Sequence, residues 1–152
     1  QTSADGLIEV LDNVSKYDYV IEVMCTNPLK TIEDIDGVIY KIDNTHADSV
    51  VSVVRIWDNH PFRVKFIEHD QLIGFNPDED PDKPNQRRQD LEPPAYVRNG
   101  SIYAMTYNQI TLLKRRLGSI TRPYVMDESR TINIDEPRDL ILAKFIMENE
   151  NK

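Results

Sequence analysis

The sequence has little cysteine and no long apolar run, and each shortage excludes a class of protein. Cys25 is the only cysteine among the 152 residues, so an internal disulfide is impossible and the usual zinc-binding spacings are absent. A reducing, cytoplasmic setting is therefore expected. The apolar runs fall far short of the roughly 18 residues that span a bilayer, and the amino terminus lacks the features of a signal peptide. We expect a soluble chain with no membrane partner.

Basic residues and clustered glycines are also scarce. The formal net charge is -8, so the molecule repels nucleic acid, and we expect no nucleic-acid partner. The five glycines are isolated from one another, so the sequence has no glycine-rich loop of the kind that cradles phosphate. The length fits one domain with one core.

Helix-like and strand-like patterns alternate along the chain, which predicts an α/β fold. The first helix begins near Ser3, with Ser3 or Asp5 as its N-cap, and Thr31 with Asp34 resembles a capping box that opens a second helix. The β-branched run 49–54 is typical of a strand buried in a parallel sheet. We further predict strands at 19–24, 101–105, 122–126 and 131–134, a hairpin at 62–67 and 72–75, an exposed loop at 76–84, a helix at 109–116, and a last amphipathic helix from Pro137 with Leu140, Ile141, Phe145 and Ile146 on its apolar side.

Fixed polar groups are concentrated in the stretch 87–103. Arg87, Arg88 and Gln89 precede a Pro-Pro that holds the backbone extended. Because guanidinium groups grip carboxylate or phosphate through two hydrogen bonds, this stretch is interpreted as a site for an acidic ligand. The alternative is a solvated loop that ends in an Asn99-Gly100 turn.

Two other places combine polar side chains with a suitable position. The loop 25–31 follows a predicted strand, and its Asn27, Lys30 and Thr31 are candidate donors to an anion; the alternative is a simple strand-to-helix turn. Asn133 and Asp135 fall on the same face of an extended segment, where two oxygen ligands suit Mg²⁺. The alternative is that Asp135 is the N-cap of the last helix.

Taken in order, these stretches resemble the acylneuraminate cytidylyltransferase family, which includes the CMP-sialic acid synthetases. The family's first loop, Gln-Pro-Thr-Ser-Pro-Leu-Arg-Thr, corresponds to residues 24–31, and its Asp-Ile-Asp to residues 34–36. The other motifs follow in family order at 47–53, 59–61, 88–91, 98–103, 122–126 and 132–135.

The resemblance implies a three-layer Rossmann-like nucleotidyltransferase fold with a mostly parallel sheet and a β-hairpin dimerisation arm at about 59–97. It implies transfer of CMP from CTP to a sialic-acid-like nonulosonic acid, with Mg²⁺ as cofactor and a homodimer formed through the arm. Arg88 and Asp135 are then the expected catalytic residues. The expected substrate-binding residues are Asn27, Lys30, Arg63, Arg88, Gln89, Asn99 and Tyr103, and the expected metal ligands are Asp135 and Asn133.

Three departures from the family pattern qualify this hypothesis. The family's amino-terminal nucleotide loop has no counterpart, so residues 1–152 are expected to be a partial cytidylyltransferase domain that is inactive alone. Met24 replaces a glutamine that contacts the sugar, and the neutral Asn133 replaces the first metal-binding carboxylate. The alternatives are a non-catalytic sugar-binding or dimerisation module, and a cytidylyltransferase for another acidic sugar such as a 3-deoxy-octulosonate.

Overall fold

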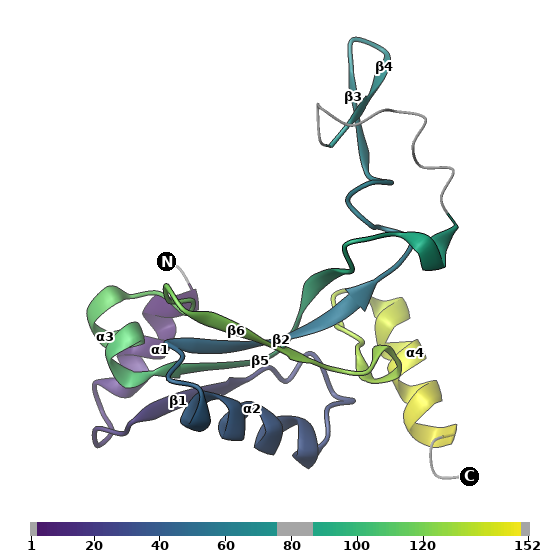
Figure 1. Cartoon of the computed structure of the whole chain (residues 1–152). Coiled ribbons are helices and arrows are strands. Elements are labelled where there is room, and N and C mark those ends of the chain that lie inside the picture. Colours follow the sequence, from purple (N-terminus) through teal and green to yellow (C-terminus); the bar gives the residue numbers. More distant parts are fainter. Residues whose placement is uncertain (1–2, 76–86, 150–152) are drawn as a thin grey trace. The chain divides into compact units, whose positions relative to one another are not determined.

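The computed structural model describes residues 3–75 and 87–149, which fall into two compact units (Figure 1). Unit 1 comprises the chain up to Val54 and from Arg98 onward, and unit 2 comprises Arg55–Val97. The predicted loop 76–84 lies outside the described residues. In the described part of the chain, every helix is too short or too polar to cross a membrane.

Unit 1 contains most of the regular structure. The helices are α1 (Ser3–Leu11), α2 (Ile32–Asn44), α3 (Tyr107–Leu113) and α4 (Pro137–Asn149), and the strands are β1 (Tyr19–Val23), β2 (Ser49–Ile56), β5 (Ala95–Thr106) and β6 (Thr121–Val125), with a 3-10 turn at Glu128–Arg130. The last residues of β2 and the first of β5 belong to unit 2.

The strands of unit 1 form a mixed sheet in the order β1-β5-β2-β6. Strands β2 and β6 are parallel, with Val51 opposite Pro123, whereas β1 and β5 are antiparallel, with Ile21 opposite Ala104. The sequence predicted mostly parallel pairing. In the described part of unit 2, a hairpin and a 3-10 turn precede β5, whereas an α-helix is the usual connection between parallel strands.

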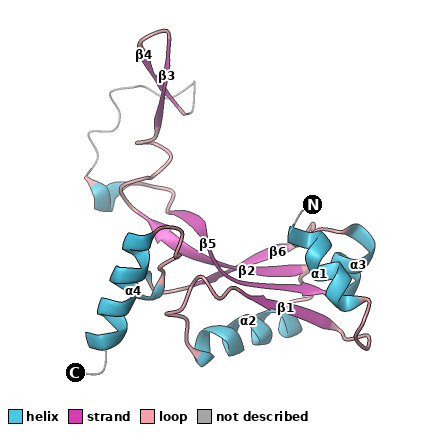
Figure 2. Cartoon of the chain, turned by 180° about the vertical axis from the view of Figure 1, so that it is seen from behind, coloured by secondary structure: helices cyan, strands magenta, loops and turns pink. Residues whose placement is uncertain are grey.

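Helices cover both faces of this sheet, so unit 1 has the predicted three layers (Figure 2). On one face, Val38 and Ile42 of α2 pack against Ile102 and Ala104 of β5. On the other face, Met105 of β5 packs with residues of α1 and α3. Neighbouring residues of β5 serve opposite cores because strand side chains alternate between the two faces.

The predicted start of α2 is confirmed. The Thr31 side chain accepts from the Asp34 amide, and the Asp34 side chain accepts from the Thr31 amide at 3.0 Å, which is a complete capping box. Only some of the large apolar residues of this helix are buried. Val38 and Ile42 are buried, whereas Ile32 and Ile39 are exposed.

Unit 2 contains the predicted hairpin, formed by β3 (Lys65–Glu68) and β4 (Gln71–Gly74). Its two turn residues, His69 and Asp70, have φ of 50° and 63°. A 3-10 turn, Arg88–Asp90, lies further along the unit.

Three local predictions are wrong. Asn99 and Gly100 do not end a loop, because both lie inside β5, where Gly100 has a φ of 67° that glycine tolerates best. Residues 131–134 form no strand; they hydrogen-bond to a loop instead. Asp135 does not cap α4, since it lies two residues before Pro137, where the helix begins, and its Oδ2 accepts from Asn133 Nδ2.

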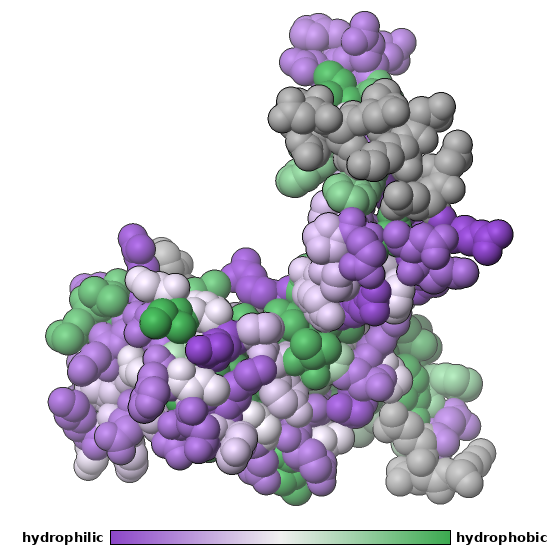
Figure 3. All heavy atoms as spheres, viewed as in Figure 1, coloured by the Kyte–Doolittle hydropathy of each residue, from purple (hydrophilic) through white to green (hydrophobic). Residues whose placement is uncertain are grey.

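The last helix differs most from its prediction. Leu140, Ile141 and Phe145 are 44%, 69% and 63% exposed, and Ala143 is the buried residue of α4. Figure 3 shows hydrophobic surface at the position of α4. The segment is helical as predicted, but the described elements of this chain do not cover the apolar side of the helix.

Ile42→Ala should lower the free energy of unfolding by about 2–5 kcal/mol, because Ile42 is 1% exposed and its removal leaves a cavity between α2 and the sheet. Ile39→Ala, on the same helix at 40% exposure, is the matched control and should cost clearly less. Urea unfolding of both variants measures the difference, and equal losses would contradict this placement of the core.

Candidate functional site

The loop after β1, residues 24–31, is closed by its own side chains. Asn27 is fully buried, and its Nδ2 donates to the Asn99 carbonyl at 3.2 Å. Lys30 Nζ donates to the Met24 carbonyl at 2.7 Å and to the Asn27 carbonyl. Burial lowers the pKa of the Lys30 ammonium. Lys30 therefore holds the loop in shape through two of its three donors.

Asn99 is the centre of a buried hydrogen-bond group. Its Oδ1 accepts from the Ser52 hydroxyl at 2.6 Å and from the Ser101 amide at 3.3 Å. Its Nδ2 donates to Met126 Sδ at 3.1 Å and to Thr131 Oγ1 at 3.4 Å. One side chain thus ties β5 to β2 and to the segment that follows β6.

The segment 131–135 runs beside the loop after β1. The Ile134 amide donates to the Thr26 carbonyl at 2.8 Å. Asn133 lies next to Gly100, because a Cβ built on Gly100 would be 3.9 Å from Asn133 Oδ1. Asn133 Nδ2 donates to Asp135 Oδ2 at 2.7 Å, and both side chains are exposed.

The structure therefore brings five predicted site residues of unit 1 into one neighbourhood at the carboxyl end of β1: Asn27, Lys30, Asn99, Asn133 and Asp135. Tyr103 is placed differently. The Arg116 guanidinium lies 5.1 Å from its ring centroid and pairs with Glu22. Tyr103 also packs against the α1 and α3 side of the sheet.

Three predicted site residues lie in unit 2. Arg63 and Arg88 both contact Asp58, at 3.3 Å and 3.6 Å. Gln89, next to Arg88, lines a pocket of about 260 Å³ together with Arg88 and Trp57. The two arginines that the resemblance assigns to the sugar are thus neighbours in space.

His60 of unit 2 has a structural role, as expected for a histidine beside a proline. It is buried, its Nε2 is 2.9 Å from the Pro93 carbonyl oxygen, and its Nδ1 accepts from the Phe62 amide. Both ring nitrogens are therefore used within the unit.

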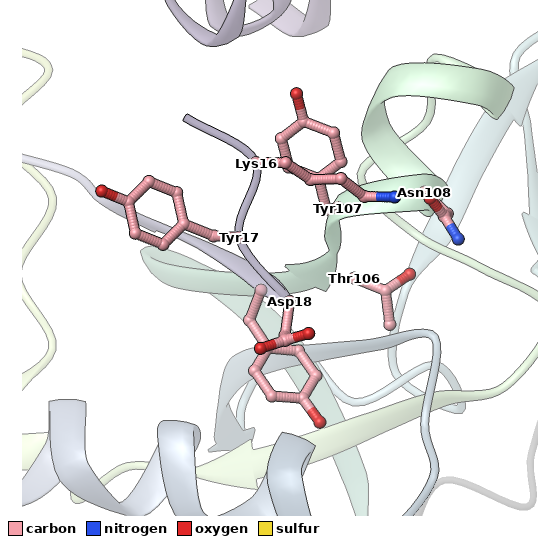
Figure 4. A pocket seen from close by; sticks show the side chains of 7 residues that line it. Lys16, Tyr17, Asp18, Thr106, Tyr107 and Asn108 are labelled. Carbon is pink, nitrogen blue, oxygen red and sulfur yellow. The ribbon is translucent and has the colours of Figure 1, made fainter. Parts of the chain in front are cut away.

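A polar pocket of unit 1 lies away from the neighbourhood of Asn27, Lys30, Asn99, Asn133 and Asp135. It has a volume of about 310 Å³ and is lined by Lys16, Tyr17, Asp18, Tyr19, Thr106, Tyr107 and Asn108 (Figure 4). Tyr19 begins β1, whereas the loop with Asn27 follows its other end. This pocket is therefore separate from the candidate site.

An ion pair fixes the turn that leads into the segment 131–135. Arg130 donates to both oxygens of Asp34, at 3.2 Å and 2.9 Å, and Asp34 is 1% exposed. Burial alone would raise the pKa of the Asp34 carboxyl, but hydrogen bonds from Arg130 and Thr31 hold that pKa below its ordinary value. Asp34, the N3 residue of the α2 capping box, thus also anchors the metal-binding candidate segment.

Sequence reasoning missed several residues that build these groups. Ser52 is a hydroxyl between two pairs of valines in the strand, which is a usable sign of a specific buried contact. Trp57 is the only tryptophan and lies two residues before the Asn59-His60-Pro61 motif. Nothing in the sequence pairs Arg130 with Asp34, which is 96 residues away.

The architecture is that of a Rossmann-like nucleotidyltransferase. The chain is similar to a solved structure of CMP:2-keto-3-deoxy-manno-octonic acid synthetase complexed with CTP, with a TM-score of 0.64 and 19% identity. The likeness covers 99% of this chain and 69% of that chain. No family model and no curated protein matches the chain. At this identity the likeness establishes the fold, and it confirms the predicted fold class.

Asp34→Asn should lower the free energy of unfolding at neutral pH by about 1–3 kcal/mol, because a charged hydrogen-bond acceptor for Arg130 is lost. The folded pKa of Asp34 lies below its unfolded value, so its contribution is present above about pH 4 and is lost as the pH falls through the folded pKa. The gap between variant and wild type should therefore narrow in acid.

Denaturant unfolding at a series of pH values measures this gap. Asp36→Asn, an exposed carboxylate on the same helix, is the control and should follow the wild type throughout. A gap that stays constant down to acid pH would show that the Asp34 charge does not stabilise the fold.

Proposed function

We propose that this chain is the greater part of a cytidylyltransferase that transfers CMP from CTP to an acidic 3-deoxy-2-keto sugar. The observation that carries the proposal is the fold likeness, over 99% of the chain, to a synthetase solved with CTP. Since a fold alone does not define a reaction, the polar groups of each unit must also suit the substrates.

The arginines of unit 2 suit an acidic sugar. Arg63 and Arg88 already share a carboxylate, that of Asp58, and a planar guanidinium matches carboxylate geometry. Fixing the sugar by its carboxylate orients the hydroxyl that attacks the α-phosphorus of CTP, which is the positioning that phosphoryl-type transfers require. In the proposed homodimer, unit 2 of one copy supplies these arginines to the other copy.

Asp135 suits a magnesium ion that is shared with substrate phosphates. Its carboxylate is exposed and its direct side-chain partner is the Asn133 amide, a neutral group. Mg²⁺ binds through one or two carboxylates plus water and phosphate oxygens, so Asp135 with the amide oxygen of Asn133 is a sufficient but weak ligand set. When bound there, the ion would neutralise charge on the transferring phosphate and on the leaving pyrophosphate.

The loop after β1 and Asn99 would support this chemistry by shape. Lys30 and Asn27 keep the loop closed, and Asn99 holds the loop beside β5. Lys30 is half-buried and uses two of its three donors in the loop, and we propose that its third donor faces the substrates.

Two classes of acidic sugar are candidate substrates. The ordered motifs favour a sialic-acid-like nonulosonic acid, and the structural neighbour favours 2-keto-3-deoxy-manno-octonic acid. Both carry the carboxylate that the arginines require, so a panel of acidic sugars with CTP decides between them by rate of pyrophosphate release.

In the full-length enzyme, Arg88→Ala should raise the KM for the acidic sugar, because a charged hydrogen bond worth on the order of 1.5–3 kcal/mol is lost. The KM for CTP should be unchanged. Steady-state kinetics at fixed CTP and at fixed sugar measure the two constants. Arg87→Ala, the neighbouring exposed arginine, is the control. A change in the KM for CTP alone would contradict the assignment of Arg88 to the sugar.

In the full-length enzyme, Asp135→Ala should abolish magnesium-dependent pyrophosphate release, because the carboxylate ligand of the ion is lost. Glu136→Ala removes the adjacent exposed carboxylate and should retain activity. Unchanged release in Asp135→Ala over a magnesium titration would rule out the metal role.

A further inference from the structure

Trp57 lies within a cluster of cationic side chains in unit 2. The Arg55 guanidinium carbon is 3.8 Å from the centroid of its ring, and the Arg88 guanidinium carbon is 5.5 Å away. Both distances are within the range of cation–π attraction. The ring therefore holds Arg88 at the wall of the pocket that Trp57, Arg88 and Gln89 line.

Asp58 bridges two of the arginines with its two oxygens. Oδ1 is 3.3 Å from Arg63 Nη1, and Oδ2 is 3.6 Å from Arg88 Nη1. Each oxygen thus faces a different guanidinium, which is how a free carboxylate would sit between two arginines.

Both contacts are exposed to solvent. The Arg63, Arg88 and Asp58 side chains are 41%, 50% and 69% exposed. Exposed ion pairs contribute little free energy, so they break readily when another anion competes. The ion pair of Asp34 with Arg130 exchanges less readily, because Asp34 is 1% exposed and both of its oxygens accept from Arg130.

We infer that Asp58 occupies the carboxylate position of an acidic ligand, between Arg63 and Arg88 on the Trp57 pocket, and that a sugar acid binds by displacing it. This inference rests on the proposed function for the identity of the ligand. It adds two roles to that function. Asp58 competes with the ligand for the two arginines, and the Trp57 ring contacts the bound ligand.

The chemistry of Asp58 defines the ligand class. A side-chain carboxylate is a planar, singly charged group, and the two arginines are spaced to receive one oxygen each. A ligand carboxylate next to a sugar ring reproduces this charge and geometry, and the ring can cover the Trp57 face, an aromatic surface that suits such contact.

The competition has a measurable consequence. In the free protein, Asp58 keeps the arginines oriented and partly neutralised, and this contact must break before the ligand binds. Removing the charge of Asp58 while keeping its shape should therefore tighten ligand binding. The expected gain is about threefold to fivefold in Kd at low salt, the scale of an exposed ion pair, and it should shrink at high salt.

The experiment is a titration of the full chain with 2-keto-3-deoxy-manno-octonic acid and with an acylneuraminic acid, without CTP. Trp57 is the only tryptophan, so its emission reports directly on this pocket, and calorimetry gives an independent Kd. The variants are Asp58→Asn, Arg88→Ala and the control Asp70→Asn. Asp70 lies in the β3–β4 turn of the same unit, has a φ of 63° that asparagine tolerates, and changes the net charge equally.

The inference predicts a lower Kd for Asp58→Asn than for wild type, an unchanged Kd for Asp70→Asn, and loss of binding for Arg88→Ala. An equal or higher Kd for Asp58→Asn, with wild type binding normally, would overturn the inference and leave the proposed function intact. Absence of binding by every variant and by wild type would overturn both, because no acidic sugar would then use this pocket.

Discussion

The hydrogen bonds of the Asn99 side chain are the constraint on which unit 1 depends. A buried amide without partners is costly, and Asn99 avoids this cost only if β2, β5 and the segment after β6 meet at one point. Its carbonyl oxygen takes the Ser52 hydroxyl and its amide nitrogen reaches Thr131. The backbone carbonyl of the same residue holds Asn27 of the loop after β1. A single residue therefore sets where both candidate loops lie.

The ion pairs of the two units differ in their exposure to solvent. In unit 1, Asp34 is buried and Arg130 is 30% exposed, and their two hydrogen bonds anchor the turn before Asn133 and Asp135. In unit 2, the pairs of Asp58 with Arg63 and Arg88 are exposed and therefore exchangeable. The first arrangement fixes a scaffold, and the second leaves guanidinium groups available to a ligand.

In the proposed reaction, each unit supplies a different set of groups. Unit 1 has the fold of a nucleotidyltransferase and carries the carboxylate that suits a magnesium ion. Unit 2 carries the arginines that suit an acidic sugar, with Trp57 beside them. Nucleotidyl transfer requires orientation and charge neutralisation more than covalent participation, so two such sets of groups are enough for the chemistry.

The sequence by itself determined the local structure: the capping box of α2, the valine-rich strand, the hairpin and the α/β order, because these depend on neighbours a few residues apart. It also indicated Asn27, Asn99, Asn133 and Asp135, but not that they lie together. Only the tertiary structure decided that Asn99–Gly100 lies inside a strand, that β5 is antiparallel to β1, and that Asp34 meets Arg130 and Asp58 meets two arginines. Those outcomes depend on contacts between residues far apart in the chain, for which local periodicity carries no information.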